Sequence, residues 1–192
     1  MISTITYLEQ NSPDDLTPAR IPAEPVEIRQ AEEPSPEFHR FLYTAVGGDW
    51  HWTGKLPWDW DQWMTWLNRP AVETWVAWVR GTPAGYASLA GRPGTEVEIE
   101  NFGLLPAFIG RGIGGHLLTV ALQQAWVLPE RQDDLGPVKR VWLHTNTLDG
   151  PHALANYRAR GLRVYRTTTE ERTDADVQPP GPWPGANRTA RS

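Results

Sequence analysis

Hydrophobic positions recur with two different periods between residues 26 and 171, and the period switches several times along the chain. Alternation among β-branched and aromatic residues predicts strands, whereas apolar residues spaced three and four apart predict helices. The clearest helical stripe comprises Leu117, Leu118, Ala121, Leu122 and Ala125. Strands are predicted at 26–33, 72–81, 82–91, 96–105, 138–145 and 162–171, and helices at 36–46, 59–70, 112–127 and 151–160.

The order of these elements predicts the fold class. Three successive strands, the first two joined by a Gly81-Thr-Pro turn, predict an antiparallel meander. We therefore expect a single α/β domain with a mixed, largely antiparallel central sheet flanked by helices. Residues 1–25 and 174–192 are polar, rich in Pro and without a sustained period. They are predicted to be loosely ordered tails on either side of a domain at 26–173.

Composition narrows the classes of function. A net charge of -5 and a pI near 5.5 argue against nucleic-acid binding, which needs a basic face. The chain has no cysteine, which excludes disulfides and thiolate metal sites, and we expect no metal. It has neither an apolar run long enough to span a membrane nor the features of a signal peptide. We expect a cytoplasmic protein with no membrane partner, and a homodimer is compatible with the sequence.

A glycine-rich loop opens the long helix predicted at 112–127. The letters of GRGIGG, with Gly110, Gly112 and Gly115, match the dinucleotide pattern G-x-G-x-x-G. A dinucleotide fold places these glycines directly after a strand and an acidic residue at the end of the next strand. Here Pro106-Ala-Phe-Ile intervenes and the next strand ends in His144-Thr145-Asn146. The loop is therefore predicted to bind a different anionic group at the helix N-terminus.

The run EIENFGLLPAFIGRGIGGHLL resembles the coenzyme A loop of the GNAT acetyltransferase superfamily, and a later A-x-x-x-Y-x-x-x-G motif supports the resemblance. That motif comprises Ala153, Tyr157 and Gly161. The loop departs from the family pattern at one position, where Ile109 replaces Gln or Arg. The resemblance covers residues 26–170 and implies acetyl-CoA as the acyl donor.

The resemblance also implies which residues bind the coenzyme. Backbone groups on one strand would pair with the pantetheine arm, if the two central strands splay apart, and Gly103 suits a bulge there. Glycine backbone N–H groups would bind the pyrophosphate, and Arg111 would add charge. The predicted coenzyme-binding residues are Phe102, Gly103, Leu104, Gly110, Arg111, Gly112, Ile113, Gly114, Gly115 and Asn146.

Tyr157 matches the tyrosine that acts as general acid toward the leaving thiolate in this family; packing of the helix on the sheet is the alternative role. The family also tends to place an Asn seven residues before this tyrosine, where the present chain has Gly150. Asn146, Asn156 and Asp149 are the candidates to replace it, and none is in register.

A general base is predicted on the strand EVEIENF. Alternation places Glu96, Glu98 and Glu100 on one face and Asn101 on the other. Glu98 falls where some family members carry a glutamate base, and Glu100 is the next choice. We expect mutual repulsion to raise the pKa of one carboxyl. A solvated acidic face, with water as the only base, is the alternative.

Tryptophan is concentrated in one region: eight of the 11 lie between Trp50 and Trp78. The resemblance places the early helices and their loop over the acceptor, so a pocket is predicted with walls of Trp50, His51, Trp52, Trp58 and Trp60. Trp63, Trp66 and Trp75 are predicted to be core residues, which is also the alternative for the pocket group. His144 and Thr145, at the end of the strand that flanks the cofactor cleft, are possible site residues, and a buried structural role is favoured for His144.

The function predicted from these features is transfer of an acetyl group from acetyl-CoA to a small-molecule amine. Aromatic walls beside acidic residues would suit a cationic or aromatic amine. A protein acetyltransferase for N-termini or lysines is the second hypothesis. The third is a non-catalytic module that binds acyl-CoA or carbohydrate.

Overall fold

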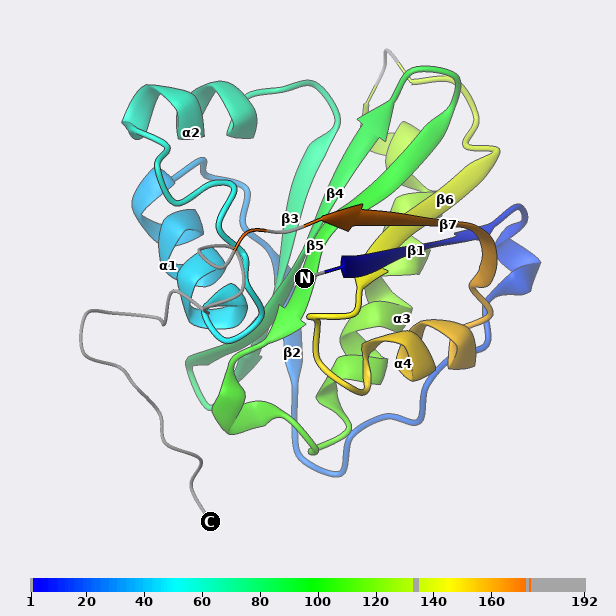
Figure 1. Cartoon of the computed structure of the whole chain (residues 1–192), viewed down its shortest axis with the longest axis horizontal. Helices are drawn as coiled ribbons and strands as arrows, with labels where there is room; N and C mark the ends of the chain where they lie inside the picture. The colour runs from blue at the N-terminus through cyan, green and yellow to red at the C-terminus, as the bar shows by residue number, and fades with distance from the viewer. Residues whose placement is uncertain (1, 133–134, 172, 174–192) are drawn as a thin grey trace.

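A seven-stranded sheet with helices on both faces forms the body of the protein (Figure 1). The computed structural model describes residues 2–132, 135–171 and 173, so the tail predicted at 174–192 lies outside the described residues. The strands are β1 (Ile2–Gln10), β2 (Glu27–Gln30), β3 (Val72–Val79), β4 (Thr82–Arg92), β5 (Glu96–Leu104), β6 (Arg140–Asn146) and β7 (Arg163–Glu171). The α-helices are α1 (Pro36–Gly47), α2 (Trp60–Leu67), α3 (Ile113–Trp126) and α4 (Ala153–Ala159).

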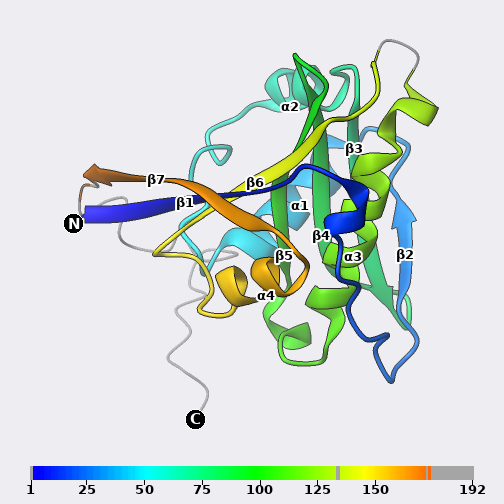
Figure 2. The same ribbon diagram turned by 90° about the vertical axis from the view of Figure 1, so that its right-hand side faces the viewer.

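The strand order is β2-β3-β4-β5-β6-β1-β7, and the only parallel neighbours in it are β5 and β6. The predicted meander is present as β3, β4 and β5. Figure 2 shows β1 and β7 running at a steep angle to β3, β4 and β5. The mixed, largely antiparallel sheet predicted from the order of elements is confirmed.

One part of the sequence prediction is wrong: the segment predicted to be a loose N-terminal tail contains a strand. Residues 2–10 form β1, which pairs antiparallel with β6 on one side and β7 on the other. Two neighbouring strands satisfy the backbone groups of β1, so a segment with weak alternation still forms an interior strand. The Ile, Thr and Tyr residues of ISTITYLEQ were the available signal, because such residues favour strands.

Helices α1 and α3 pack on opposite faces of the sheet. The apolar stripe of α3, including Leu118 and Leu122, packs against Leu89 of β4 and Val97 of β5. On the other face, Leu42 and Val46 of α1 pack against Tyr86 of β4. Side chains on the two faces of β4 thus pack into separate hydrophobic cores on opposite sides of the sheet, as expected for a strand covered on both faces.

Local capping fixes where α2 begins. Asp59 accepts a hydrogen bond from the backbone N–H of Gln62 at 2.8 Å, and the Gln62 side chain accepts one from the Asp59 N–H at 2.9 Å. This reciprocal pair is a capping box, so the helix starts at Trp60. Trp60 therefore lies at the exposed first turn of α2.

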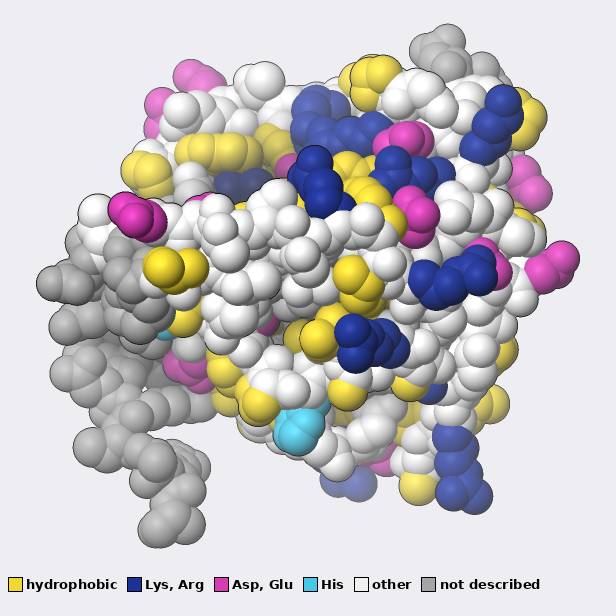
Figure 3. Space-filling model, turned by 45° about the vertical axis from the view of Figure 1, so that its right-hand side comes forward, with side chains coloured by type: hydrophobic (Ala, Val, Ile, Leu, Met, Phe, Trp, Pro, Cys, Tyr) yellow, Lys and Arg dark blue, Asp and Glu magenta, His cyan; other side chains and the backbone are white. Residues whose placement is uncertain are grey.

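Basic side chains converge at one end of the sheet. Arg92 ends β4, Arg140 begins β6, and Arg69 lies just before β3. Figure 3 shows Lys and Arg side chains gathered around hydrophobic ones in the upper part of the molecule. The strand β5 begins at this end, so its acidic residues meet cations there despite the net charge of -5 for the whole chain.

Candidate active site

The site is built around a fork between the two parallel strands. β5 and β6 pair only through Glu96, Val97 and Glu98, and pairing ends where Glu98 lies opposite Trp142. Beyond this point the strands separate, as anticipated, and residues of both line a cavity of about 710 Å³. The cavity continues to the glycine turn before α3, the loop after α1, and α4.

The glycine turn fits an extended anionic group. Gly110 and Gly112 have φ of 83° and 78°, in the left-handed region that favours glycine. No atom lies within 4 Å of the position that a Cβ would occupy on either residue. Gly112 is the N-cap of α3, so the unpaired N–H groups of the first helical turn lie beside this open space.

Most residues predicted to bind the coenzyme line the cavity, and two do not. Ile113 is fully buried and packs in the core. Arg111 pairs with Glu24 and stacks over Phe108, with 4.9 Å from its guanidinium carbon to the ring centroid. The cavity-lining members of the set are Phe102, Gly103, Leu104, Gly110, Gly112, Gly114, Gly115 and Asn146.

Gly103 does not form the bulge expected at its position. It pairs regularly with Tyr86, and a Cβ on it would lie 2.5 Å from Cγ1 of Val46. The bulge occurs at Glu100 instead, because Ser88 pairs with Asn101 and Leu89 pairs with Ile99. Glycine at 103 therefore allows α1 to pack closely against β5.

Tyr157 projects from α4 into the cavity. Its ring meets that of Phe102 edge to face, with centroids 5.9 Å apart, and the residue is 6 % exposed. Burial, and to a smaller extent the negative charge of Asp149, raises the pKa of the Tyr157 hydroxyl well above its usual range. The hydroxyl therefore holds its proton at neutral pH.

The loop after β6 is closed by Asp149. Oδ2 of Asp149 accepts hydrogen bonds from the Thr145 hydroxyl at 2.6 Å and the Asn146 N–H at 3.0 Å. Oδ1 of Asn146 accepts from the Leu148 N–H at 2.7 Å, which leaves its amide nitrogen for other partners. Gly150 lies under the Trp50 ring, whose nearest atom would be 3.5 Å from a Cβ on Gly150. The loops after α1 and β6 thus meet across the cavity.

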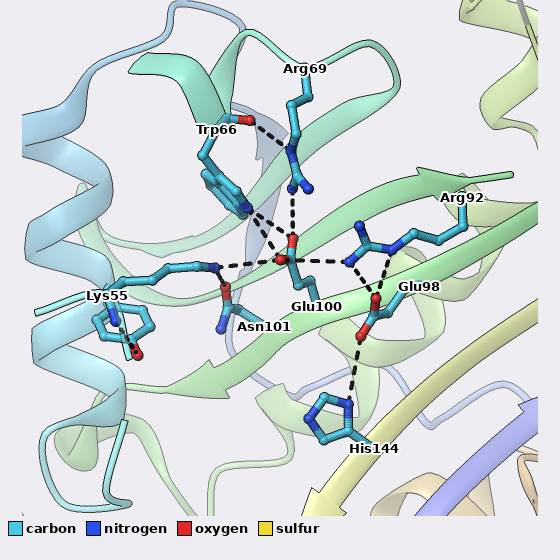
Figure 4. Close-up of polar contacts among 9 residues, drawn as sticks. Lys55, Trp66, Arg69, Arg92, Glu98, Glu100, Asn101 and His144 are labelled. Atoms are coloured by element: carbon cyan, nitrogen blue, oxygen red, sulfur yellow. Dashed lines mark hydrogen bonds and ion pairs between the residues drawn. The ribbon is translucent and has the colours of Figure 1, made fainter. Parts of the chain in front are cut away.

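The two predicted bases have different surroundings (Figure 4). Glu100 lines the cavity, but its oxygens accept hydrogen bonds from the Trp66 indole at 3.1 and 3.2 Å and from Arg69 at 3.0 Å. Glu98 is 5 % exposed and does not line the cavity. Its Oε2 accepts a hydrogen bond from Arg92 Nε at 2.8 Å, and its Oε1 lies 3.6 Å from Nδ1 of His144.

The expected rise in a carboxyl pKa does not occur at Glu98. Burial alone would raise the pKa of Glu98, but the nearby imidazole of His144 and the hydrogen bonds and charge of Arg92 lower it below its usual value. The prediction considered only repulsion between carboxylates. It missed the cations that the fold brings to them from other elements.

Lys55 is the main residue of this cluster that the sequence analysis missed. Its side chain is 12 % exposed and lies 4.0 Å from the centroid of the Trp66 ring. Its ammonium donates a hydrogen bond to Oδ1 of Asn101 at 2.8 Å and lies 3.8 Å from Glu100. Burial lowers the pKa of Lys55 to about 8, although the charge of Glu100 opposes this shift. Contact with both residues is possible because the bulge at Glu100 breaks the predicted alternation, which had placed Asn101 on the opposite face.

The predicted tryptophan pocket is present only in part. Trp50, His51 and Trp52 line the cavity, whereas Trp58 and Trp60 do not. Trp58 packs edge to face on Trp63, with centroids 5.2 Å apart, in a separate aromatic cluster. Trp60 is 56 % exposed at the start of α2.

The predicted core residues Trp63 and Trp66 are buried, and Trp75 is partly buried against the main core. The buried structural role favoured for His144 is wrong, whereas its alternative role as a site residue is compatible with its position. Its side chain is 43 % exposed and lines the cavity.

His51 has two unusual features. Its φ is 61°, a conformation that non-glycine residues rarely adopt, and its Nδ1 is buried with no hydrogen-bond partner among the described residues. His51 also lines the cavity. His51 therefore remains a candidate to contact an acceptor.

The forked sheet and the glycine turn together are typical of acyltransferases that use coenzyme A. Comparison with known proteins leads to the same class of protein. Residues 27–162 match the model of the acetyltransferase (GNAT) family, so the chain belongs to this family of acyltransferase enzymes. No curated protein matches the chain.

Solved structures share the fold at low sequence identity. A GCN5-related N-acetyltransferase from Kribbella flavida is 20% identical with a TM-score of 0.59, and the match covers 86% of this chain and 56% of that one. A GCN5-related N-acetyltransferase from Sphaerobacter thermophilus is 19% identical, with a TM-score of 0.56 and coverage of 86% and 50%. The chain thus spans about half the length of these two relatives. An aminoglycoside acetyltransferase from an uncultured soil metagenomic sample, solved with trehalose, is 18% identical, with a TM-score of 0.53 and coverage of 70% and 86%.

Two further observations concern the described part of the chain. None of its helices is both long enough and apolar enough to cross a membrane. None of its clusters of His, Asp and Glu has the three or more members that could hold a metal ion.

Proposed function

We propose that this protein transfers an acetyl group from acetyl-CoA to a primary amine of a small molecule. The observation that carries the proposal is one continuous cavity. It joins the glycine turn at the N-terminus of α3, the open edge of β5 beyond the fork, the Tyr157 side chain, and the aromatic loop after α1.

The residues of this cavity fit coenzyme A. Backbone N–H groups from Gly110 to Gly115 are suited to the pyrophosphate. The segment Phe102–Leu104 lacks a partner strand on the β6 side and is suited to the pantetheine amides. When bound, acetyl-CoA supplies an activated thioester. Tyr157 holds a proton on its hydroxyl that it can give to a leaving thiolate, and the N–H groups near the fork can stabilise an oxyanion.

The acceptor is expected on the side of the cavity formed by Trp50, His51, Trp52 and Tyr43. Aromatic walls favour a flat or cationic amine by contacts of about 0.5–2 kcal/mol each. The acidic residues of β5 do not give this region a net negative charge. Lys55, Arg69 and Arg92 surround Glu98 and Glu100. Aromatic contact, rather than excess negative charge, therefore selects the amine.

Release of the coenzyme thiol tests this proposal. The protein has no cysteine, so a thiol reagent reports the product alone. Acetyl-CoA is offered with amino acids, polyamines, aminoglycosides, aromatic amines, and a peptide with a free N-terminus and a lysine. At least one small amine is expected to release thiol. Release with the peptide alone favours a protein acetyltransferase, and coenzyme binding without release favours a binding module.

Tyr157→Phe removes the proposed proton donor and is expected to lower kcat by about 10²-fold or more. Tyr165→Phe is the matched control, since Tyr165 lies on β7 outside the cavity and is 40% exposed. An unchanged kcat for Tyr157→Phe, with coenzyme binding intact, would remove the acid role from this residue.

A further inference from the structure

His144 occupies the fork at the point where the parallel strands separate. It lies two residues after Trp142, the last residue of β6 that pairs with β5. Leu143 is 1% exposed and packs in the core beneath the sheet together with Tyr157. Because side chains alternate along a strand, His144 projects to the face opposite Leu143. The cavity is therefore lined by Tyr157 from one face of the sheet and by His144 from the other.

The imidazole of His144 is oriented by a carboxylate that is itself held in place (Figure 4). Oε2 of Glu98 accepts a hydrogen bond from Arg92 at 2.8 Å, which leaves Oε1 directed at Nδ1 of His144, 3.6 Å away. The rings of Tyr7 and Trp142 flank the imidazole at centroid distances of 5.6 and 6.4 Å. This arrangement favours a proton on Nδ1 and leaves Nε2 as the acceptor atom.

The other polar groups of the cavity are less suited to accept a proton. Glu100 lines the cavity, but Trp66 and Arg69 hold its oxygens. Asp149 uses Oδ2 to bond Thr145 and Asn146. His51 and His152 also line the cavity, but the described residues form no ion pair with either.

We propose that His144 is the catalytic base, with Glu98 and Arg92 as positioning residues. This inference rests on the proposed acetyl transfer. The lone pair of the amine nitrogen forms the bond to the acetyl carbon while Nε2 of His144 takes a proton from that nitrogen. The carbon–sulfur bond breaks, its electron pair stays on sulfur, and the Tyr157 proton goes to sulfur. Solvent later takes the proton from His144 and returns one to Tyr157, so the products are the amide and the free thiol.

Titratable and charged groups from several elements face His144. Glu98 of β5 lies against the imidazole, and Arg92 of β4 pairs with Glu98. Tyr7 of β1 lies beside the ring, and Arg166 of β7 lies over Tyr7 at 3.9 Å. From the loops, Asp149, His51 and His152 line the same cavity.

The test is the pH profile of kcat/KM for thiol release with the best amine. His144→Gln is expected to lower kcat/KM by about 10²- to 10⁴-fold near neutral pH and to remove the acidic limb that the imidazole causes. Glu98→Gln removes the carboxylate that faces Nδ1 of His144, so it should change the profile with a smaller loss of rate than His144→Gln causes. Glu96→Gln is the matched control on the same strand and should leave the profile unchanged, since Glu96 pairs with Arg140 away from the cavity.

Several outcomes would overturn the inference. A His144→Gln or His144→Asn enzyme that binds coenzyme A and keeps the wild-type profile removes the base role while leaving the proposed function intact. A wild-type protein that acetylates no amine overturns both. NMR titration of the His144 imidazole gives a readout independent of turnover. An imidazole titration that Glu98→Gln leaves unchanged contradicts the positioning role.

Discussion

Lys55 provides a test of the buried charge cluster beside the cavity. Burial lowers its pKa from 10.5 to about 8 in the folded protein, because few polar groups replace the water around the ammonium. The unfolded chain keeps the ordinary value. Between about pH 8 and about pH 10.5 the unfolded chain therefore binds a proton that the native protein has released, so the free energy of unfolding rises with pH. The contribution of Lys55 from about pH 7 to about pH 9.5 is a rise of about 2 kcal/mol.

Lys55→Met removes the titrating group, so this part of the rise should disappear. The measurement is chemical denaturation of both proteins at several pH values, compared by slope rather than by absolute stability. Lys139→Met is the matched control, because Lys139 is the second of the two lysines and is exposed. If Lys55→Met retains the wild-type rise, the ammonium is not desolvated in the native protein and the reasoning is refuted.

Two glycine substitutions test the cavity walls. In Gly47→Ala the new Cβ would lie 2.4 Å from Trp52 atoms, so the indole must move. We expect the free energy of unfolding to fall by about 1–3 kcal/mol. Because Trp52 lines the cavity, we also expect a raised KM for the amine. Gly54→Ala, in the loop that follows α1, meets no atom within 4 Å and is the stability control; equal losses would refute the packing argument. Gly112→Ala places a side chain at φ 78° in the glycine turn and should weaken coenzyme A binding in calorimetry by about tenfold. Gly94→Ala has similar backbone strain at φ 85° in a distant turn and is the control. If it weakens coenzyme A binding equally, the effect of Gly112→Ala does not arise at the glycine turn.

Patterns local in sequence predicted much of this fold. The apolar stripe of α3 and the meander depend on periods that each segment carries by itself, and both are present. The strand β1 was missed because its stability comes from pairing with β6 and β7, which lie more than 120 residues away in sequence. Pairing at that separation leaves only a weak signal in the local pattern.

In the candidate site too, features carried by a local motif were predicted, and features that depend on contacts between distant segments were not. The glycine turn and Tyr157 could be predicted as cavity residues because their motifs are contiguous or regularly spaced. The surroundings of the carboxylates could not, because one extra residue at Glu100 changes which side chains share a face. Lys55 and His144 reach these carboxylates from the loop after α1 and from β6, and no local pattern records that convergence.

A crystal structure of the protein with coenzyme A would test the proposed cofactor site directly. We expect the pyrophosphate on the backbone N–H groups of the turn from Gly110 to Gly115, and the pantetheine along Phe102–Leu104. The thiol is expected at the fork between Tyr157 and His144. A coenzyme bound outside the fork, or with its thiol directed away from both side chains, would contradict the central claim.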